Sequence, residues 1–153
     1  MTQLITERQA ADLLLAADNI LLLAHQYPDG DTVGSNYALC LALRAMGKQV
    51  RVLCGDPIPE RYEYMTAGVE MAEFAPDFVC AVDVADACLL GPTLQETYGH
   101  CVDLCIDHHN TNVGYALSLR HTPELRFVAD DSIAYSAGLA ATINRIKKEE
   151  TTE

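Results

Sequence analysis

Apolar runs of strand length that lead into acidic and histidine residues constrain the fold of this chain most strongly. The run at 101–106 leads directly into an Asp-His-His triplet, and the run at 20–24 leads into a His- and Asp-rich segment at 25–31. A third run, at 78–84, carries Asp83 near its end. Continuous apolar runs are typical of strands buried on both faces of a parallel sheet. The pattern therefore predicts a buried sheet with polar groups gathered beyond one of its edges.

Segments of helical period alternate with the predicted strands. Strands are predicted at 20–25, 48–54, 78–84, 101–106 and 125–129. Helices are predicted at 6–19, 34–46, 60–66, 85–90 and from Asp131 or Ser132 to about 147, with Thr6 capping the first helix and Asp31 or Thr32 the second. Strands that alternate with helices are joined by right-handed crossovers. The predicted fold class is α/β, a doubly wound, mainly parallel sheet with helices on both faces.

Length and hydropathy indicate a protein with a real core. The 153 residues are enough to bury a core and are expected to form one domain. Half of the residues are hydrophobic, yet no apolar run approaches the ~20 residues that span a bilayer. The N-terminal segment has neither the basic stretch nor the apolar stretch of an export signal. We therefore expect a soluble, cytoplasmic protein with no membrane partner.

Charge and cysteine usage narrow the class of partner. The net charge of −12 argues against a surface for duplex nucleic acid, because Lys and Arg supply that affinity. The six cysteines form no CxxC pair and lie in apolar stretches, which predicts buried, reduced thiols rather than zinc ligands or disulfides. Because the chain is so acidic, a phosphate-bearing ligand is expected to bind locally, through metal ions.

Carboxylates and imidazoles are predicted to converge at the carboxyl edge of the sheet, where folds of this class bind ligands. The candidates are His25, Asp29, Asp31, Asp83, Asp107, His108 and His109. Carboxylates in one place raise one another's pKa unless cations neutralise them. Oxygen and imidazole donors without thiolates suit Mn²⁺ or Mg²⁺, and two ions about 3.5–4 Å apart form a clamp for phosphoester hydrolysis.

Each cluster taken alone has a simpler interpretation. The segment 25–31 is typical of a turn with an Asp N-cap, Asp83 of an acid at a strand end, and the segment 107–109 of a solvated loop. Their shared position after three strands favours one functional site. Outside these clusters, we expect surface positions for His100 and His121, and helix caps at Asp86, Asp130 and Asp131.

Three motifs stand in a fixed order along the chain. They are His25-x-x-Pro28-Asp29-x-Asp31 with Gly34-Ser35 behind it, Asp83 within Val82-Asp83-Val84, and Asp107-His108-His109. Together they resemble the N-terminal domain of the DHH family of phosphoesterases, within the RecJ-like superfamily. The segment 127–132 resembles the branch of bifunctional oligoribonucleases that also dephosphorylate 3′-phosphoadenosine 5′-phosphate. The resemblance implies a manganese-dependent hydrolase that acts on short oligonucleotides or nucleoside phosphates.

The resemblance also implies a role for each candidate residue. In the implied arrangement, His25, Asp29 and Asp83 hold one Mn²⁺. Asp31, Asp83 and His108 hold the other, and Mg²⁺ could substitute for Mn²⁺. Asp107 orients His108, and His109 faces the substrate phosphate. Asp107 and His109 are thus the implied catalytic residues beside the metal ligands.

The match to the family is incomplete in several respects. The fourth motif of the family, an Asp-Thr-Gly after a further strand, has no counterpart, and neither does the C-terminal DHH-associated domain that grips the substrate. We therefore expect an incomplete catalytic domain at 1–146, truncated or split, and a charged, frayed tail at 147–153. Gly138 is a smaller departure, at a position where this branch commonly has Glu.

Alternatives from other classes stay open at this point. A noncatalytic metal- or phospholigand-binding module would also account for the missing ligand and domain. Cyclic-dinucleotide phosphodiesterase is a less favoured activity. So is manganese pyrophosphatase, whose first motif usually has Asn where this chain has Tyr27. A homodimer is compatible with the sequence, which does not specify the oligomeric state.

Overall fold

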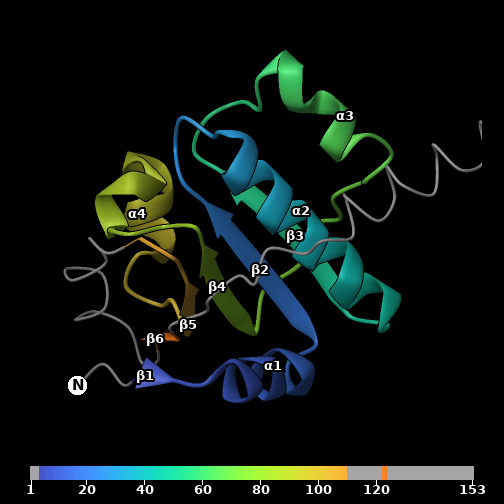
Figure 1. Cartoon of the computed structure of the whole chain (residues 1–153), viewed down its shortest axis with the longest axis vertical. Helices are drawn as coiled ribbons and strands as arrows, with labels where there is room; N and C mark the ends of the chain where they lie inside the picture. The colour runs from blue at the N-terminus through green and yellow to red at the C-terminus, as the bar shows by residue number, and fades with distance from the viewer. Residues whose placement is uncertain (1–3, 110–121, 124–153) are drawn as a thin grey trace, which may run out of the picture.

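The structure, a computed structural model, describes residues 4–109 and 122–123. Its elements follow in the order β1 (Leu4–Ile5), α1 (Glu7–Ala16), β2 (Asn19–Ala24), α2 (Gly30–Ala45), β3 (Gln49–Cys54), η1 (Glu60–Tyr62), α3 (Glu63–Thr66), β4 (Phe78–Val82), η2 (Ala87–Leu90), α4 (Pro92–Tyr98), β5 (Leu104–Ile106) and β6 (Thr122–Pro123). The labels η1 and η2 denote 3₁₀ helices. Figure 1 shows α2 lying across the front of the sheet and α1 below it.

Four parallel strands form the central sheet, in the order β3-β2-β4-β5. Ile20 of β2 pairs with Val50 of β3 on one side and with Phe78 of β4 on the other. The strand order therefore reverses between β2 and β4, and folds of this class bind ligands beyond the carboxyl ends at such a reversal. A separate parallel pair joins β1 to β6. The predicted α/β class and the parallel sheet are confirmed.

Residues of β2 alternate between two apolar clusters on opposite faces of the sheet. Ile20, Leu22 and Ala24 pack with buried residues of α1 and α2, whereas Leu21 and Leu23 pack with those of η2 and α4. All five are at most 2 % exposed. Successive side chains of a strand point to opposite faces, so a strand covered on both faces reads as one apolar run. The predicted helices on both faces are thereby confirmed.

Some predicted elements have different ends in the structure. The third strand ends at Val82, one residue before Asp83, and the fourth begins only at Leu104. Helix α4 was not predicted, because its seven residues bury only Leu94 and so show no clear period. Pro92 suits its first turn, where a proline loses no hydrogen bond. The predicted strand at 125–129 and the last predicted helix lie outside the described residues.

The cysteine prediction is only partly right. All six thiols are free, as expected, and Cys40, Cys80 and Cys105 are buried. Cys88 and Cys101 are exposed, however. Cys88 lies on the solvent-facing side of η2, and Cys101 lies in the short connection after α4.

Three further expectations can be compared with the structure. His100 is exposed, as expected for a surface residue. Asp86 caps η2, because its side chain accepts a hydrogen bond from the N–H of Cys88. Within the described part of the chain, none of the helices combines the length and apolar character that crossing a membrane requires. The predictions for His121, Asp130 and Asp131 concern positions outside the described residues.

Candidate metal centre

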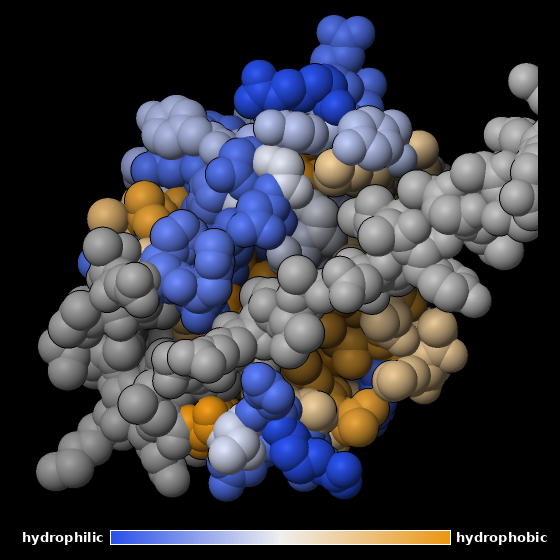
Figure 2. Space-filling view, viewed as in Figure 1, coloured by the Kyte–Doolittle hydropathy of each residue, from blue (hydrophilic) through white to orange (hydrophobic). Residues whose placement is uncertain are grey.

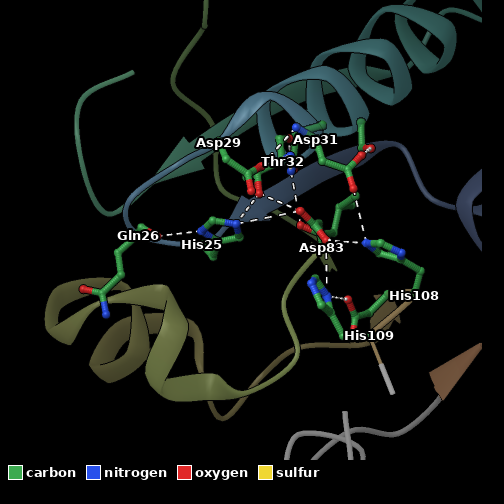
Figure 3. Close-up of polar contacts among 12 residues, drawn as sticks. His25, Gln26, Asp29, Asp31, Thr32, Asp83, His108 and His109 are labelled. Atoms are coloured by element: carbon green, nitrogen blue, oxygen red, sulfur yellow. Dashed lines mark hydrogen bonds and ion pairs between the residues drawn. The ribbon is translucent and has the colours of Figure 1, made fainter. Parts of the chain in front are cut away.

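Polar side chains from three strand ends and one helix start meet at the carboxyl edge of the sheet, as Figure 3 shows. His25 follows β2, Asp83 follows β4, and His108 and His109 follow β5 with Asp107 before them, while Asp29 and Asp31 open α2. The strands are anchored in the core, so the residues directly after them are held in place. The edge is the one at which the strand order reverses.

Asp29 fixes the first turn of α2 as its N-cap. Its Oδ1 accepts hydrogen bonds from the backbone N–H groups of Asp31 and Thr32, each at 3.0 Å. The hydrogen bond from Thr32 holds the pKa of Asp29 below its ordinary value. The prediction that Asp31 or Thr32 caps this helix was wrong. The helix begins earlier, at Gly30, and Asp29 reaches both N–H groups from outside it.

His25 presents one ring nitrogen to the centre. Its Nδ1 lies 2.6 Å from the carbonyl oxygen of Gln26, which can only accept, so Nδ1 carries a hydrogen. Nε2 contacts the hydroxyl of Thr32 and lies 3.8 Å from Oδ2 of Asp83. A histidine that is oriented through its other nitrogen in this way is typical of metal ligands.

The loop after His25 is tied to neighbouring connections. The backbone N–H of Gln26 donates to the carbonyl oxygen of Leu89 at 2.6 Å. Its side-chain amide donates to the carbonyl oxygen of Cys88 at 3.2 Å. The N–H of Tyr27 donates to Oδ2 of Asp56 at 2.9 Å. Tyr27 has a φ of 57°, which non-glycine residues adopt only when their surroundings hold them. The loop that carries the first motif is therefore fixed on both sides.

Asp83 is the central carboxylate of the site. It follows β4 with a φ of 61°, a conformation that Asp adopts more readily than most residues. Its N–H still donates to the carbonyl of Ile106 at 2.8 Å, and its Oδ2 accepts from the hydroxyl of Thr32 at 2.6 Å. Asp83 is only 5 % exposed, and its Oδ1 is buried without a hydrogen-bond partner. Burial raises the pKa of this carboxyl above its ordinary value.

Figure 3 shows His108 on the side of Asp83 away from His25, and His109 below Asp83. His108 Nε2 lies 3.2 Å from Oδ2 of Asp31 and 3.5 Å from Oδ1 of Asp83. His109 Nδ1 lies 3.4 Å from the same Asp83 oxygen and 2.7 Å from Oδ1 of Asp107. The hydrogen bond to Asp107 raises the pKa of His109.

Asp107 supports a different histidine from the one that the resemblance implied. It was expected to orient His108, but its Oδ1 faces His109. His108 instead reaches Asp31 and Asp83, so both histidines lie by Asp83 while only His109 bonds to Asp107. Oδ2 of Asp107 is buried without a hydrogen-bond partner. Asp107 is thus, like Asp83, a buried acid with one oxygen that has no hydrogen-bond partner.

Two groups of possible metal ligands share Asp83. One consists of His25, Asp29 and Asp83, and the other of Asp83, His108 and His109, with one candidate atom per residue lying within 4.8 Å of the others in its group. The first group coincides with the ligand set that the resemblance implied for one ion. The second contains two of the three ligands implied for the other ion, and the third, Asp31, contacts His108. A carboxylate between two ligand groups is what a two-ion site requires.

The chemistry of these donors fits a divalent cation. A buried oxygen without a partner, as on Asp83 and Asp107, costs about 1–3 kcal/mol, which a bound cation would offset. Among the described residues, no lysine or arginine forms an ion pair with either of these two acids. Carboxylate and imidazole donors without thiolates suit Mn²⁺ and Mg²⁺. The described residues can therefore accommodate the metal ions that the sequence predicted.

Two buried polar residues of α2 hold the centre together, and neither was among the predicted site residues. The hydroxyl of Thr32 contacts both His25 and Asp83. Asn36 donates to the carbonyls of Thr32 at 2.9 Å and of Val82 at 3.2 Å, which ties α2 to the end of β4. Their spacing of four residues puts both on the helix face toward the sheet. Polar residues at this spacing on an apolar face were the signal that could have found them.

These features define a class of protein: a parallel α/β domain with a carboxylate and imidazole centre beyond the reversal of strand order. The model of the DHH family, N-terminal domain, matches residues 19–150, which is most of the chain. The chain belongs to the DHH family, as its three ordered motifs indicated.

The fold is also similar to that of an exopolyphosphatase-related protein from Bacteroides fragilis, known from its crystal structure. The two share a TM-score of 0.62 and 19 % sequence identity, over 75 % of this chain and 38 % of the other. The chain thus spans well under half the length of that protein. At this level of identity, the similarity shows a common fold.

Proposed function

We propose that this chain is the catalytic domain of a metal-dependent phosphoester hydrolase, with Mn²⁺ as its cofactor. The observation that carries the proposal is the position of Asp83 between two groups of possible ligands. Membership of the DHH family supports the same class of reaction, and so does the fold shared with an exopolyphosphatase-related protein. Mg²⁺ would suit the same oxygen and imidazole donors.

The proposed ligands are His25, Asp29 and Asp83 for one ion, and Asp31, Asp83 and His108 for the other. When bound, divalent ions neutralise the charge that develops on a phosphoryl group and lower the pKa of water. The bond of His25 to Gln26 and the contact of Thr32 with Asp83 keep these donors in place. These hydrogen bonds of the chain support the proposed positions of the ligands.

His109 is proposed to hold a proton next to the substrate phosphate. Its Nδ1 is engaged by Asp107, so Nε2 is the nitrogen that a substrate would contact. The side chain is 45 % exposed, which leaves it accessible to a phosphate oxygen. The hydrogen bond that His109 donates to Asp107 raises the pKa of His109, so the protonated form persists to higher pH. A protonated imidazole in this place can donate to a leaving oxygen.

Short oligonucleotides and nucleoside phosphates are the proposed substrates. The resemblance of the segment 127–132 to the oligoribonuclease branch supports this class. Tyr27 supports it as well, because it is 78 % exposed in the loop beside His25. An exposed aromatic ring can stack on a nucleobase, whereas inorganic phosphates offer it nothing to stack on.

Hydrolysis by the full chain tests the proposal, with the diribonucleotide ApA and inorganic pyrophosphate as substrates. We expect Mn²⁺-dependent cleavage of ApA that EDTA abolishes, and slower hydrolysis of pyrophosphate. Asp83→Asn and His108→Ala should each lower the rate roughly 100-fold or more, because both remove proposed ligands. Asp12→Asn is the matched control, since Asp12 is an exposed acid of α1 that pairs with Arg8.

Each outcome of this assay separates two classes of function. Equal rates for the wild type, Asp83→Asn and His108→Ala would refute the assignment of the centre. Mn²⁺ binding without hydrolysis of either substrate would favour a noncatalytic metal- or phospholigand-binding module. Faster hydrolysis of pyrophosphate than of ApA would move the substrate class to that of the manganese pyrophosphatases.

A further inference from the structure

Gln26 follows the proposed ligand His25 directly and bonds both to that ligand and to the neighbouring turn η2. Its backbone carbonyl oxygen lies 2.6 Å from Nδ1 of His25. Its backbone N–H donates to the carbonyl oxygen of Leu89, and its side-chain amide donates to the carbonyl oxygen of Cys88. Leu89 and Cys88 both belong to η2. Figure 3 shows the side chain of Gln26 turned away from the centre, so this residue joins η2 to the imidazole of His25.

Two glycines of different loops leave room for the side chain of Gln26. A β-carbon on Gly55, in the loop after β3, would lie 3.5 Å from Cβ of Gln26. A β-carbon on Gly91, directly after η2, would lie 3.2 Å from Oε1 of Gln26. Gly91 also has a φ of 79°, which side chains other than glycine rarely adopt. The side chain of Gln26 is therefore closely packed between two connections, in a place from which its amide reaches Cys88.

The loop that carries Gln26 lies beyond the apolar core. Figure 2 shows hydrophilic side chains gathered at the end of the molecule toward which the arrows of β2 and β4 point in Figure 1. Ala24, the last residue of β2, is 2 % exposed, whereas His25 and Gln26 are only partly buried. Apolar packing thus holds the strand, and the position of the His25 ring after it depends on hydrogen bonds.

The carbonyl of Gln26 determines which nitrogen of His25 faces the centre. A carbonyl oxygen only accepts, so an N–H of the ring is at Nδ1, and Nε2 is the nitrogen available to a metal ion. Nε2 lies 3.8 Å from Oδ2 of Asp83, the carboxylate that the two ligand groups share. A shift of the Gln26 peptide would release Nδ1–H and let the ring rotate away from Asp83. The geometry of this ligand therefore depends on a peptide that η2 holds in place.

We propose that Gln26 is a positioning residue for His25 and sets the affinity of one of the two metal ions. This inference rests on the proposed function, in which His25, Asp29 and Asp83 hold that ion. Groups that orient a metal-bound histidine typically change metal affinity about 10–100-fold when they are replaced. Apart from the shared Asp83, the ligands proposed for the other ion come from α2 and from the segment after β5. The other ion should therefore keep its affinity when Gln26 is replaced.

Gln26→Met tests this inference, because methionine has a similar length and cannot donate to Cys88. Calorimetric titration with Mn²⁺ should show two bound ions in the wild type, of which one binds about tenfold more weakly in Gln26→Met and the other is unchanged. Gln49→Met makes the same exchange at an exposed position at the amino end of β3, and it should match the wild type. Unchanged affinity for both ions in Gln26→Met would overturn the inference, and so would an equal loss at both.

Proton NMR of the metal-free chain in EDTA tests the role of Gln26 independently of metal binding. The wild type and Gln49→Met should show a hydrogen-bonded Nδ1–H proton of His25 that exchanges slowly with water, and Gln26→Met should show faster exchange. Gln26→Asn keeps the amide but is one methylene too short to reach Cys88, so this milder variant should behave in the same way. Equal exchange rates in the wild type and Gln26→Asn would overturn the inference. Failure of the wild type to bind Mn²⁺ would count against the proposed function alone, and the exchange rates would then decide the role of Gln26.

Discussion

Replacement of Asp83 by asparagine should change the stability of the domain in opposite directions with and without metal ions. The side chain of Asp83 is buried, its Oδ1 has no hydrogen-bond partner, and its pKa is raised by burial. Asparagine keeps the shape, can still accept the hydrogen bond from Thr32, and tolerates the positive φ of this position. The exchange therefore removes a buried charge without disturbing the backbone.

The size of the effect follows from the buried charge. A buried ionised group that is incompletely paired costs at least about 1–3 kcal/mol, whereas neutral asparagine leaves a less costly polar atom in its place, so the variant should gain about 1–2 kcal/mol when metal is absent. For a chain of this size, that gain corresponds to a Tm increase of roughly 3–6 °C. Mn²⁺ at 100 times its Kd would stabilise the wild type by about 2.7 kcal/mol, and the variant lacks the shared ligand. The order of the two Tm values should therefore reverse.

Thermal unfolding followed by far-UV circular dichroism measures both effects, in EDTA and in excess Mn²⁺. Burial raises the pKa of Asp83 in the folded state. The free energy of unfolding should therefore fall as the pH rises from the ordinary Asp range through that raised pKa, because the buried carboxyl becomes charged. The advantage of Asp83→Asn in EDTA should therefore disappear at acidic pH. A variant that melts below the wild type in EDTA and gains as much from Mn²⁺ would refute the reasoning.

Further predictions concern the hydrogen bonds and the packing of the site. Asp107→Asn should lower the pKa of His109 in proton NMR titrations in EDTA. In the wild type, the pair of Asp107 and His109 adds stability at low pH, and that stability should be lost as the pH rises through the raised pKa of His109. Asp29→Ala should lower the free energy of unfolding by about 1 kcal/mol, because the helix cap is lost, and it should weaken Mn²⁺ binding in calorimetry. Asp29→Ser keeps a capping side chain and should weaken only Mn²⁺ binding. Gly55→Ala should cost about 1–3 kcal/mol in urea unfolding, because the new β-carbon would lie 2.6 Å from the carbonyl oxygen of Leu90.

The positions of the site residues could be predicted because strand ends are visible in the sequence. The apolar runs before His25 and Asp107 mark the strands β2 and β5, and a parallel sheet brings their carboxyl ends to one edge. Asp83 followed from the same argument. The reversal of strand order then placed all three clusters beyond neighbouring strands.

The partners of the site residues could not be predicted in the same way. Asp107 bonds to His109 rather than His108, which lies beside Asp31 instead, and the sequence pattern does not distinguish these two pairings. The positive φ of Asp83 and the contacts of Thr32 depend on how α2 packs against β4. Local pattern fixes where a side chain leaves the backbone, whereas tertiary packing fixes what that side chain contacts.

The EPR spectrum of the Mn²⁺-loaded chain tests most directly whether Asp83 is shared by two ions. Two Mn²⁺ ions about 3.5–4 Å apart and bridged by one carboxylate are magnetically coupled. We therefore expect a coupled multiline spectrum in the wild type and in Asp12→Asn, and its loss in Asp83→Asn. A spectrum of isolated Mn²⁺ ions alone, the same in the wild type and in Asp83→Asn, would contradict the account.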